Sequence, residues 1–235
     1  MTFFTKKEII KLLCTDIKAF NNYRKELYRL GYCKINLQEV NLRKVNLSGV
    51  DLGCSELSSF NLKNINLRNS DLRKSILYNV TLEDIDLSNS NLSNSCWENI
   101  DLNNVDLTNA NLGRSTFNNV NFNNVNLSFA NLNNSKLKYT NFSEVNFANA
   151  NLKRTIINQN YIQILGIGNY SSSIIYLFED DIVFYGSFKG KLKELEKEMK
   201  RKYSEWTNER IDILECIKMI EMKKKRLEKE KVKNK

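Results

Sequence analysis

Residues 100–114 read IDLNNVDLTNANLGR, which is one five-residue unit written three times. In each unit a large apolar residue is central, a smaller residue lies two positions before it, and Asn or Asp stands between them. The central position is large and apolar in 24 consecutive units, from Leu37 to Leu152. Neither a helix nor an ordinary strand has a period of five, so this internal repeat decides the fold.

A second period, of twenty residues, lies within the first. Every fourth unit departs from the Asn or Asp rule and carries Ser two positions before its centre. The departures are Glu56, Ile76, Cys96, Thr116 and Lys136. Four units per period predict a coil with four sides, in which central and pre-central residues face inward and residues twenty apart stack. Two adjacent inner walls are bulky and two are small. At the spacing of paired strands, six coils would form a rod roughly 29 Å long.

This run of (Val/Ala/Ser)-(Asn/Asp)-(Leu/Phe)-x-x units resembles the pentapeptide-repeat family over just over half of the chain. The resemblance implies a right-handed quadrilateral β-helix. We therefore expect a mainly β fold: a β-helix of about six coils with an α-helical N-terminal cap and a C-terminal appendage of a β-hairpin and helices. The predicted core residues are Leu42, Leu47, Leu67, Leu87, Trp97, Leu107, Phe117, Phe122, Leu127 and Phe142.

Four segments are expected along the chain. Residues 1–34 form a helical cap, because Thr5 and Glu8 have capping-box spacing and Gly31 can end a second helix that starts near Asp16. Residues 35–157 form the β-helix, whose open end requires a cap. Residues 158–190 form a β-hairpin cap, in which residues 174–178 and 182–185 flank an acidic turn at 179–181. Residues 191–235 form a charged amphipathic helical region.

In the last segment, one apolar residue recurs every seven positions. These residues are Leu192, Met199, Trp206, Ile213, Ile220 and Leu227. Such a stripe must pack against another surface. The hairpin or the end of the solenoid is favoured over a dimer. Ser204 or Thr207 could divide the segment into two helices. Residues 184–192 are similar to a segment that follows the repeats in other pentapeptide proteins, which supports a C-terminal cap.

Composition points away from catalysis. The chain has 36 basic and 27 acidic residues, a formal charge of +9, and no His, the usual general base and metal ligand. A filled coil with flat sides offers no pocket, so we expect no catalytic site, no cofactor and no metal. The five cysteines are Cys14, Cys33, Cys54, Cys96 and Cys216. They read as incidental, and no apolar run has the length of a signal peptide or membrane span. A reduced cytoplasmic protein is expected.

One stretch of the solenoid is acidic. Residues 75–113 contain six acids and no Lys or Arg, although residues 35–157 carry eleven of each sign. Two interpretations account for this stretch. Asn and Asp can exchange at solvent-facing positions, or the acids can form an anionic surface that binds a partner. The candidate partner-binding residues are Glu83, Asp84, Asp86, Glu98, Asp101, Asp106 and Trp206. The solvent-facing Asn109 is expected to tolerate substitution.

Three functions follow as hypotheses. The first is a non-catalytic scaffold that binds another protein, as yet unidentified, with a homodimer through the C-terminal helix as an alternative. The resemblance implies the second, because quinolone-resistance pentapeptide proteins are anionic rods that mimic duplex DNA and protect a type II topoisomerase, DNA gyrase. This neutral solenoid fits that subclass poorly. The third is a binder of nucleic acid or an anionic surface through the basic termini. That hypothesis requires positive charge gathered on one face.

Overall fold

The computed structural model describes residues 3–38, 40, 42, 45–59, 61–143, 145–157, 161–167, 172–178, 180–186, 188–203 and 207–233. The chain divides into two compact units. The first contains residues 1–146 and 150–158, and the second contains residues 147–149 and 159–235. Each unit is described by itself below.

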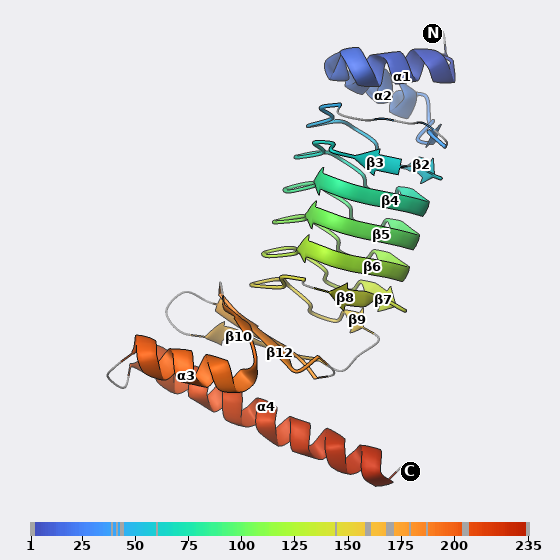
Figure 1. The fold of residues 1–235 in the computed structure, drawn as a ribbon. Helices are drawn as coiled ribbons and strands as arrows, with labels where there is room; N and C mark the ends of the chain where they lie inside the picture. The colour runs from blue at the N-terminus through green and yellow to red at the C-terminus, as the bar shows by residue number, and fades with distance from the viewer. Residues whose placement is uncertain are drawn as a thin grey trace. The chain divides into compact units, whose positions relative to one another are not determined.

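The first unit begins with two helices and continues as a stack of coils (Figure 1). Its elements are α1 (Lys6–Thr15), α2 (Ile17–Arg29), β1 (Ile35–Asn36), β2 (Ser55–Ser58), β3 (Asn61–Lys63), β4 (Ile76–Asp86), β5 (Cys96–Asp106), β6 (Thr116–Asn126), β7 (Lys136–Lys138), β8 (Asn141–Ser143) and β9 (Ile156–Ile157). The strands form one parallel sheet in the order β1-β2-β4-β5-β6-β7-β9, with β3 beside β4 and β8 beside β6. The predicted β-solenoid of about six turns is confirmed.

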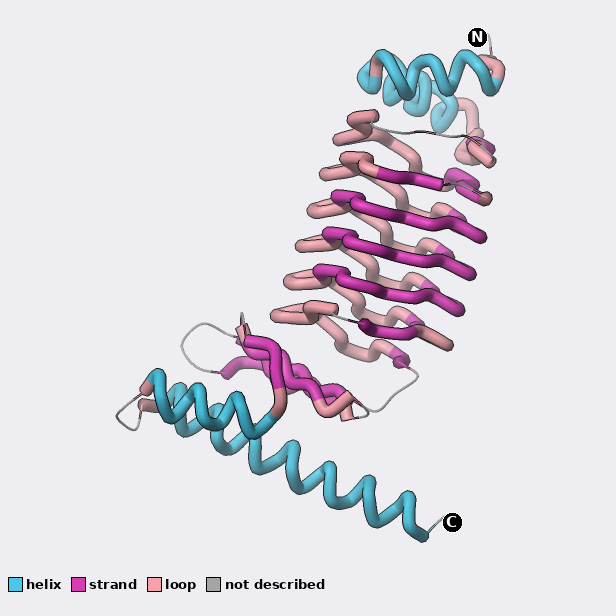
Figure 2. Tube along the Cα trace, viewed as in Figure 1, coloured by secondary structure: helices cyan, strands magenta, loops and turns pink. Residues whose placement is uncertain are grey.

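Adjacent coils pair with an offset of twenty residues. Leu77 pairs with Trp97, and Trp97 pairs with Phe117, in parallel register. The long strands β4, β5 and β6 cover two sides of each coil, whereas the other two sides are turns joined by isolated bridges such as Asn91 to Asn111 (Figure 2). The period of twenty therefore sets the register of every coil on the next.

The corners between sides are residues with left-handed backbone conformation. The second residue after each central residue has a positive φ at all twenty described positions from Cys54 to Arg154, with values from 52° to 60°. Twelve of these residues are Asn, which tolerates this conformation better than most residues that carry a β-carbon. The left-handed backbone conformation of the corners thus explains part of the abundance of Asn.

The bore is filled by the central residues. Nine of the ten predicted core residues are buried, and Trp97, Leu107, Phe117 and Leu127 have no exposed surface. The indole Nε1 of Trp97 donates to the hydroxyl of Ser95 at 2.7 Å. The one polar atom of this buried side chain therefore has a hydrogen-bond partner. Phe142 is only partly buried, and its ring centroid lies 5.3 Å from that of Phe122.

The helical cap has the predicted capping residues. Thr5 and Glu8 form a capping box at the start of α1, and Asp16 caps α2 by accepting from the backbone N–H of Ala19. Gly31, with φ of 83°, follows the end of α2. Asn21 on α2 donates to the Gly49 carbonyl at 2.8 Å, which attaches the helix to the first coils. The predicted cap on this end of the solenoid is confirmed by these contacts.

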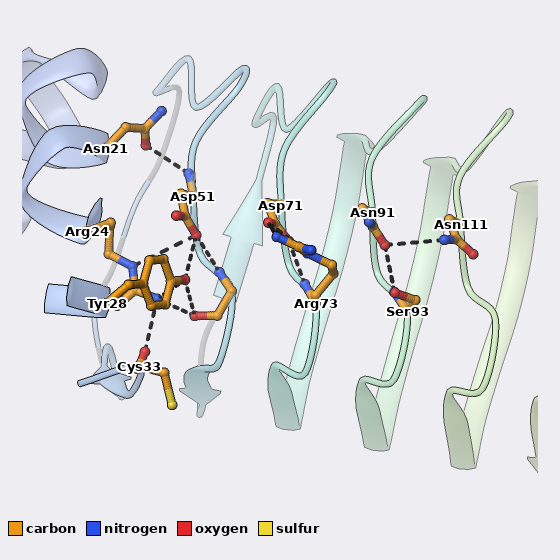
Figure 3. A network of polar contacts seen from close by, with 11 residues as sticks. Asn21, Arg24, Tyr28, Cys33, Asp51, Asp71, Arg73, Asn91, Ser93 and Asn111 are labelled. Carbon is orange, nitrogen blue, oxygen red and sulfur yellow. Dashed lines mark hydrogen bonds and ion pairs between the residues drawn. The ribbon is translucent and has the colours of Figure 1, made fainter. Parts of the chain in front are cut away.

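A buried arginine fixes α2 to the coils (Figure 3). Arg24 has no exposed surface. Its Nη2 donates to the Tyr28 hydroxyl at 2.6 Å, to the Cys33 carbonyl at 3.0 Å and to the Gly53 carbonyl, and its Nε lies 3.9 Å from the Asp51 carboxylate. Burial raises the pKa of Tyr28 to about 12, against the opposing effect of Arg24. Tyr28 is therefore a neutral phenol where α2 meets the coils.

The second unit contains a four-stranded antiparallel sheet and two helices. Its elements are β10 (Tyr161–Ile167), β11 (Ser172–Leu177), β12 (Ile182–Tyr185), β13 (Phe188–Gly190), α3 (Leu192–Lys202) and α4 (Asn208–Lys233). The strands pair in chain order. The predicted hairpin is present as β11 and β12, but the prediction missed β10 and β13. Residue 179 of the predicted turn lies outside the described residues. The role of this unit as a cap stays a prediction.

Four residues of the predicted apolar stripe, Leu192, Met199, Ile213 and Ile220, are buried against this sheet. Leu195 and Met199 of α3 and Ile213, Ile217 and Ile220 of α4 form one buried cluster with residues of β11 and β12. Packing onto the hairpin was therefore the correct choice for this stripe, and the segment is two helices. Within the described residues, no helix has the length and apolar composition needed to cross a membrane.

Substitutions in the bore and at the corners should destabilise the protein for different reasons. Leu107→Asp would place an unpaired carboxylate in the apolar bore, and we expect a loss of roughly 4 kcal/mol or more in the free energy of unfolding. Asn109, expected from the sequence to tolerate substitution, lies at a corner with a φ of 57°, so this tolerance should depend on the replacing residue. Asn109→Gly should change stability little, and Asn109→Val should cost roughly 1–2 kcal/mol. Urea unfolding followed by circular dichroism measures all three. Equal stability of the two Asn109 variants would contradict this account of the corners.

The buried arginine supports a second prediction. Arg24→Ala leaves the carbonyls of Cys33 and Gly53 without this donor and Asp51 without its cation, so we expect a loss of roughly 3 kcal/mol. Arg29→Ala is the matched control on the same helix, because its ion pair with Glu26 is exposed and should contribute less than about 0.5 kcal/mol. Urea unfolding gives both values, and hydrogen exchange should show loss of protection in residues 17–29 of the Arg24 variant alone. Equal losses in the two variants would contradict a structural role for Arg24.

Candidate functional site

The six acids of the predicted acidic stretch do not form one surface. Glu98 lies on the first strand side, Glu83 and Asp101 lie on the second, Asp84 is a corner residue, and Asp86 and Asp106 lie on a turn side. Stacking at twenty-residue intervals brings only Asp86 and Asp106 into register with each other. The sequence therefore placed the acids at one height of the rod but could not tell that they point in different directions.

Most of these acids have structural partners. Glu83 forms an ion pair with Lys63 at 2.5 Å, and Asp86 lies 3.7 Å from Arg68. Asp101 accepts a hydrogen bond from the Asn121 side chain at 2.7 Å. In the part of the chain that the structure describes, Glu98 has no ion pair.

Asn and Asp on the turn sides hold the backbone. The carboxylate of Asp106 accepts from the N–H of Thr108 at 2.9 Å, and the same pattern recurs along both turn sides. Side-chain amides also bond between coils, as in the ladder of Asn91, Asn111, Asn131 and Asn151. These contacts are amide ladders, like those between stacked chains in cross-β assemblies. They need no ligand.

One side of the solenoid differs from the other three. The first strand side, here called the mixed face, carries no Asn or Asp at the position before each centre from β2 to β9. Its outward residues are Glu56, Ser58, Ile76, Tyr78, Cys96, Glu98, Thr116, Asn118, Lys136, Lys138 and Ile156. The strand register stacks Glu56, Ile76, Cys96, Thr116, Lys136 and Ile156 in one column. The mixed face is thus apolar and acidic on its early coils and basic near its end.

A shallow groove lies on the early coils of the mixed face. It has a volume of about 390 Å³ and is lined by residues that include Glu56, Ile76, Tyr78, Cys96 and Glu98. Ile76 and Tyr78 are each 41% exposed, although neighbouring outward positions are polar. Burial, with Glu98 adding to the effect, raises the pKa of the Cys96 thiol, so Cys96 is neutral and contributes a weakly polar surface. The groove offers an apolar centre between two carboxylates.

The cavity found among the described residues of the bore is much smaller. A cavity of about 20 Å³ lies in the bore and is lined by leucines and Trp97. This volume holds about one water molecule, and an apolar lining gives such a water no partners. Among the described residues, no group of three or more His, Cys, Asp or Glu side chains is placed to hold a metal ion.

The second unit also has an exposed apolar surface. Met219 and Met222 on α4 are 54% and 58% exposed and lie beside Lys223 and Arg226 in an open groove. Lys224 is bound to Asp181 at 2.7 Å. The last candidate from the sequence, Trp206, lies outside the described residues.

Apart from Glu98, the candidate residues predicted from the sequence did not include the mixed face, although its signal was present. The departures from the Asn or Asp rule at every fourth unit are the outward residues of this face, and Tyr78 follows two positions after Ile76. Their separation by twenty residues placed them in one column. The acidic stretch drew attention because charge is visible in a linear sequence, whereas a shared face becomes visible only through the period.

Two family models match the repeats. Residues 52–89 match the model described as pentapeptide repeats in 8 copies, and residues 90–165 match the model described as a pentapeptide repeat region. No curated protein matches the sequence significantly.

Several solved structures have the same kind of repeat. The pentapeptide repeat protein Rfr23 from the cyanobacterium Cyanothece 51142 is 28% identical, with 60% of this chain and 99% of that chain covered and a TM-score of 0.34. A pentapeptide repeat protein from the Arabidopsis thaliana thylakoid lumen is 21% identical, with coverage of 40% and 66% and a TM-score of 0.39. QnrB1, a plasmid-mediated fluoroquinolone resistance protein, is 16% identical, with coverage of 53% and 87% and a TM-score of 0.33. At these TM-scores the likenesses carry no argument about function.

The two adjoining family matches, on a solenoid of about six turns, show that the chain belongs to the pentapeptide-repeat family.

Proposed function

We propose that this protein is a non-catalytic scaffold that binds another protein through the mixed face. The observation that carries the proposal is the exposed pair of Ile76 and Tyr78 in a groove between Glu56 and Glu98. On the turn sides, the corresponding residues are Asn or Asp that bond to the backbone or to the next coil. The large apolar residues of the mixed face have no such structural role, and exposed apolar surface of this kind is typical of interaction sites.

The chemistry of the mixed face suggests what a partner must present. An apolar or aromatic side chain would fill the groove over Ile76 and Cys96, with Lys or Arg beside Glu56 and Glu98. Further along, Lys136 and Lys138 are exposed and would favour acidic residues of the partner. The parallel strands beneath hold the backbone of these residues in place, so binding would cost little conformational entropy. The proposed partner is therefore a protein segment with an apolar anchor and charges of both signs.

The test compares two substitutions in the same coil. Ile76→Glu removes the apolar centre of the groove, and Thr81→Glu makes the same charge change on the adjacent strand side. With each variant immobilised in native cell extract, we expect Ile76→Glu to reduce recovery of a specific protein about tenfold, equal to about 1.4 kcal/mol. Recovery with Thr81→Glu should match the wild type. Circular dichroism must show that both variants are folded. Equal recovery by all three proteins would contradict a binding role for this groove.

Interaction with a type II topoisomerase has less support. A mimic of duplex DNA needs dense negative charge, about one charge per 1.7 Å of axis. In this solenoid Glu83 and Asp86 are paired with basic residues, and the six acids point in several directions. We therefore expect micromolar protein to leave gyrase supercoiling unchanged, with or without a quinolone. Protection of the enzyme in this assay would overturn that expectation, and loss of protection in Asp101→Asn would then place the contact on the second strand side.

A further inference from the structure

We propose that Cys33 and Cys54 are a redox-active pair that forms a reversible disulfide, joining the end of the helical cap to the coils. The sequence suggested incidental cysteines, because the two thiols are far apart along the chain and have no C-x-x-C spacing. The fold brings them together at the junction between α2 and the solenoid.

The strand register places the two cysteines diagonally opposite each other, one position out of register. Ile35 pairs with Ser55 in parallel, so extending the register by one residue puts residue 34 beside Cys54, with Cys33 next along the chain. From the strand spacing and the rise per residue, their Cα atoms are roughly 6 Å apart. This separation lies within the range of about 4.4–6.8 Å that a disulfide can bridge.

Arg24 supports this arrangement independently. Its Nη2 donates both to the Cys33 carbonyl, at 3.0 Å, and to the Gly53 carbonyl, so the two backbone segments meet at one nitrogen atom (Figure 3). Because Gly53 precedes Cys54, this contact fixes the segment that carries each thiol. The buried guanidinium thus acts as a clamp beneath the pair.

The thiols are accessible and interact with each other. Cys33 is exposed and Cys54 is half-buried, and both are free cysteines. Burial raises the pKa of the Cys54 thiol, and its interaction with the Cys33 thiol raises that pKa further, whereas Lys74 and Arg24 oppose the rise. A soluble oxidant can reach Cys33 first.

The oxidant that balances the reaction is a low-molecular-weight disulfide such as glutathione disulfide. The Cys33 thiolate attacks one sulfur of this disulfide, whose S–S bond breaks to release one glutathione thiolate. The Cys54 thiolate then attacks the Cys33 sulfur of the mixed disulfide and releases the second glutathione thiolate. The two protons lost by the protein thiols are taken up by the released thiolates. Two protein thiols are oxidised, and one glutathione disulfide is reduced to two glutathione molecules.

The bond would strengthen the attachment of the cap. It would close the loop from residue 33 to residue 54 and would cross from the segment after α2 to the coil that contains β2. A loop of this length should raise the midpoint of thermal unfolding by about 5–10 °C, provided that the native geometry accepts the bond. Reduction by thiols would reverse the change.

The experiment uses the full chain, reduced and then incubated with glutathione disulfide. Intact mass and peptide mapping should show loss of two hydrogen atoms, a link between the peptides of Cys33 and Cys54, and the higher unfolding midpoint. Cys14→Ser is the matched control, because Cys14 is exposed on the same cap. This variant should form the link as the wild type does. Cys33→Ser and Cys54→Ser should instead accumulate a mixed disulfide with glutathione on the remaining cysteine of the pair.

Two results would overturn the proposal. In one, the wild-type protein accumulates glutathione on both Cys33 and Cys54 without forming the link. In the other, Cys33 or Cys54 pairs with a different cysteine at the same rate. Loss of fold in a serine variant would not affect the test, because the wild type and the Cys14 variant report the link directly.

Discussion

The four-sided cross-section depends on one backbone constraint: a left-handed residue at every corner. For a residue with a β-carbon, this conformation costs roughly 1 kcal/mol. The repeat imposes it at twenty described positions, so the coils form only because burial of the central residues and pairing with adjacent coils offset the cost. Asn reduces the cost at most corners, and its abundance is a consequence of the geometry rather than a sign of a ligand.

The same geometry separates structural positions from positions that are free to vary. On the turn sides, the residue before each centre is Asn or Asp because its oxygen accepts from the backbone two residues later, as in Asp106 and Thr108. On the strand sides, neighbouring coils already satisfy the backbone, so this requirement is absent. One strand side still carries an amide ladder, with Asn103 and Asn123 bonded at 3.0 Å. The other is the mixed face, where apolar residues such as Ile76 can occur.

Most of the solenoid could be predicted because 24 units in register leave no ambiguity about which residues face inward. Prediction was weaker where a single residue determines conformation or pairing. The φ of Asn109 follows from the corner geometry, which the hydrophobic pattern does not contain. Strand β10 was missed although it is rich in Ile, because the Gly and Ser residues that follow it suggested a loop. The repeat pattern did not predict that Cys33 lies near Cys54, because Cys33 precedes the first unit and the pattern assigns it no pairing partner.

The parallel pairing of each coil with the one before it also gives folding a direction. The cap is synthesised before the coils, and β1 then presents a paired position for β2, twenty residues later. Each new coil needs only the coil that has just left the ribosome, so the growing protein exposes one open strand edge at a time. Since unpaired edges are where chains associate wrongly, growth from the capped end limits the time for aggregation during synthesis.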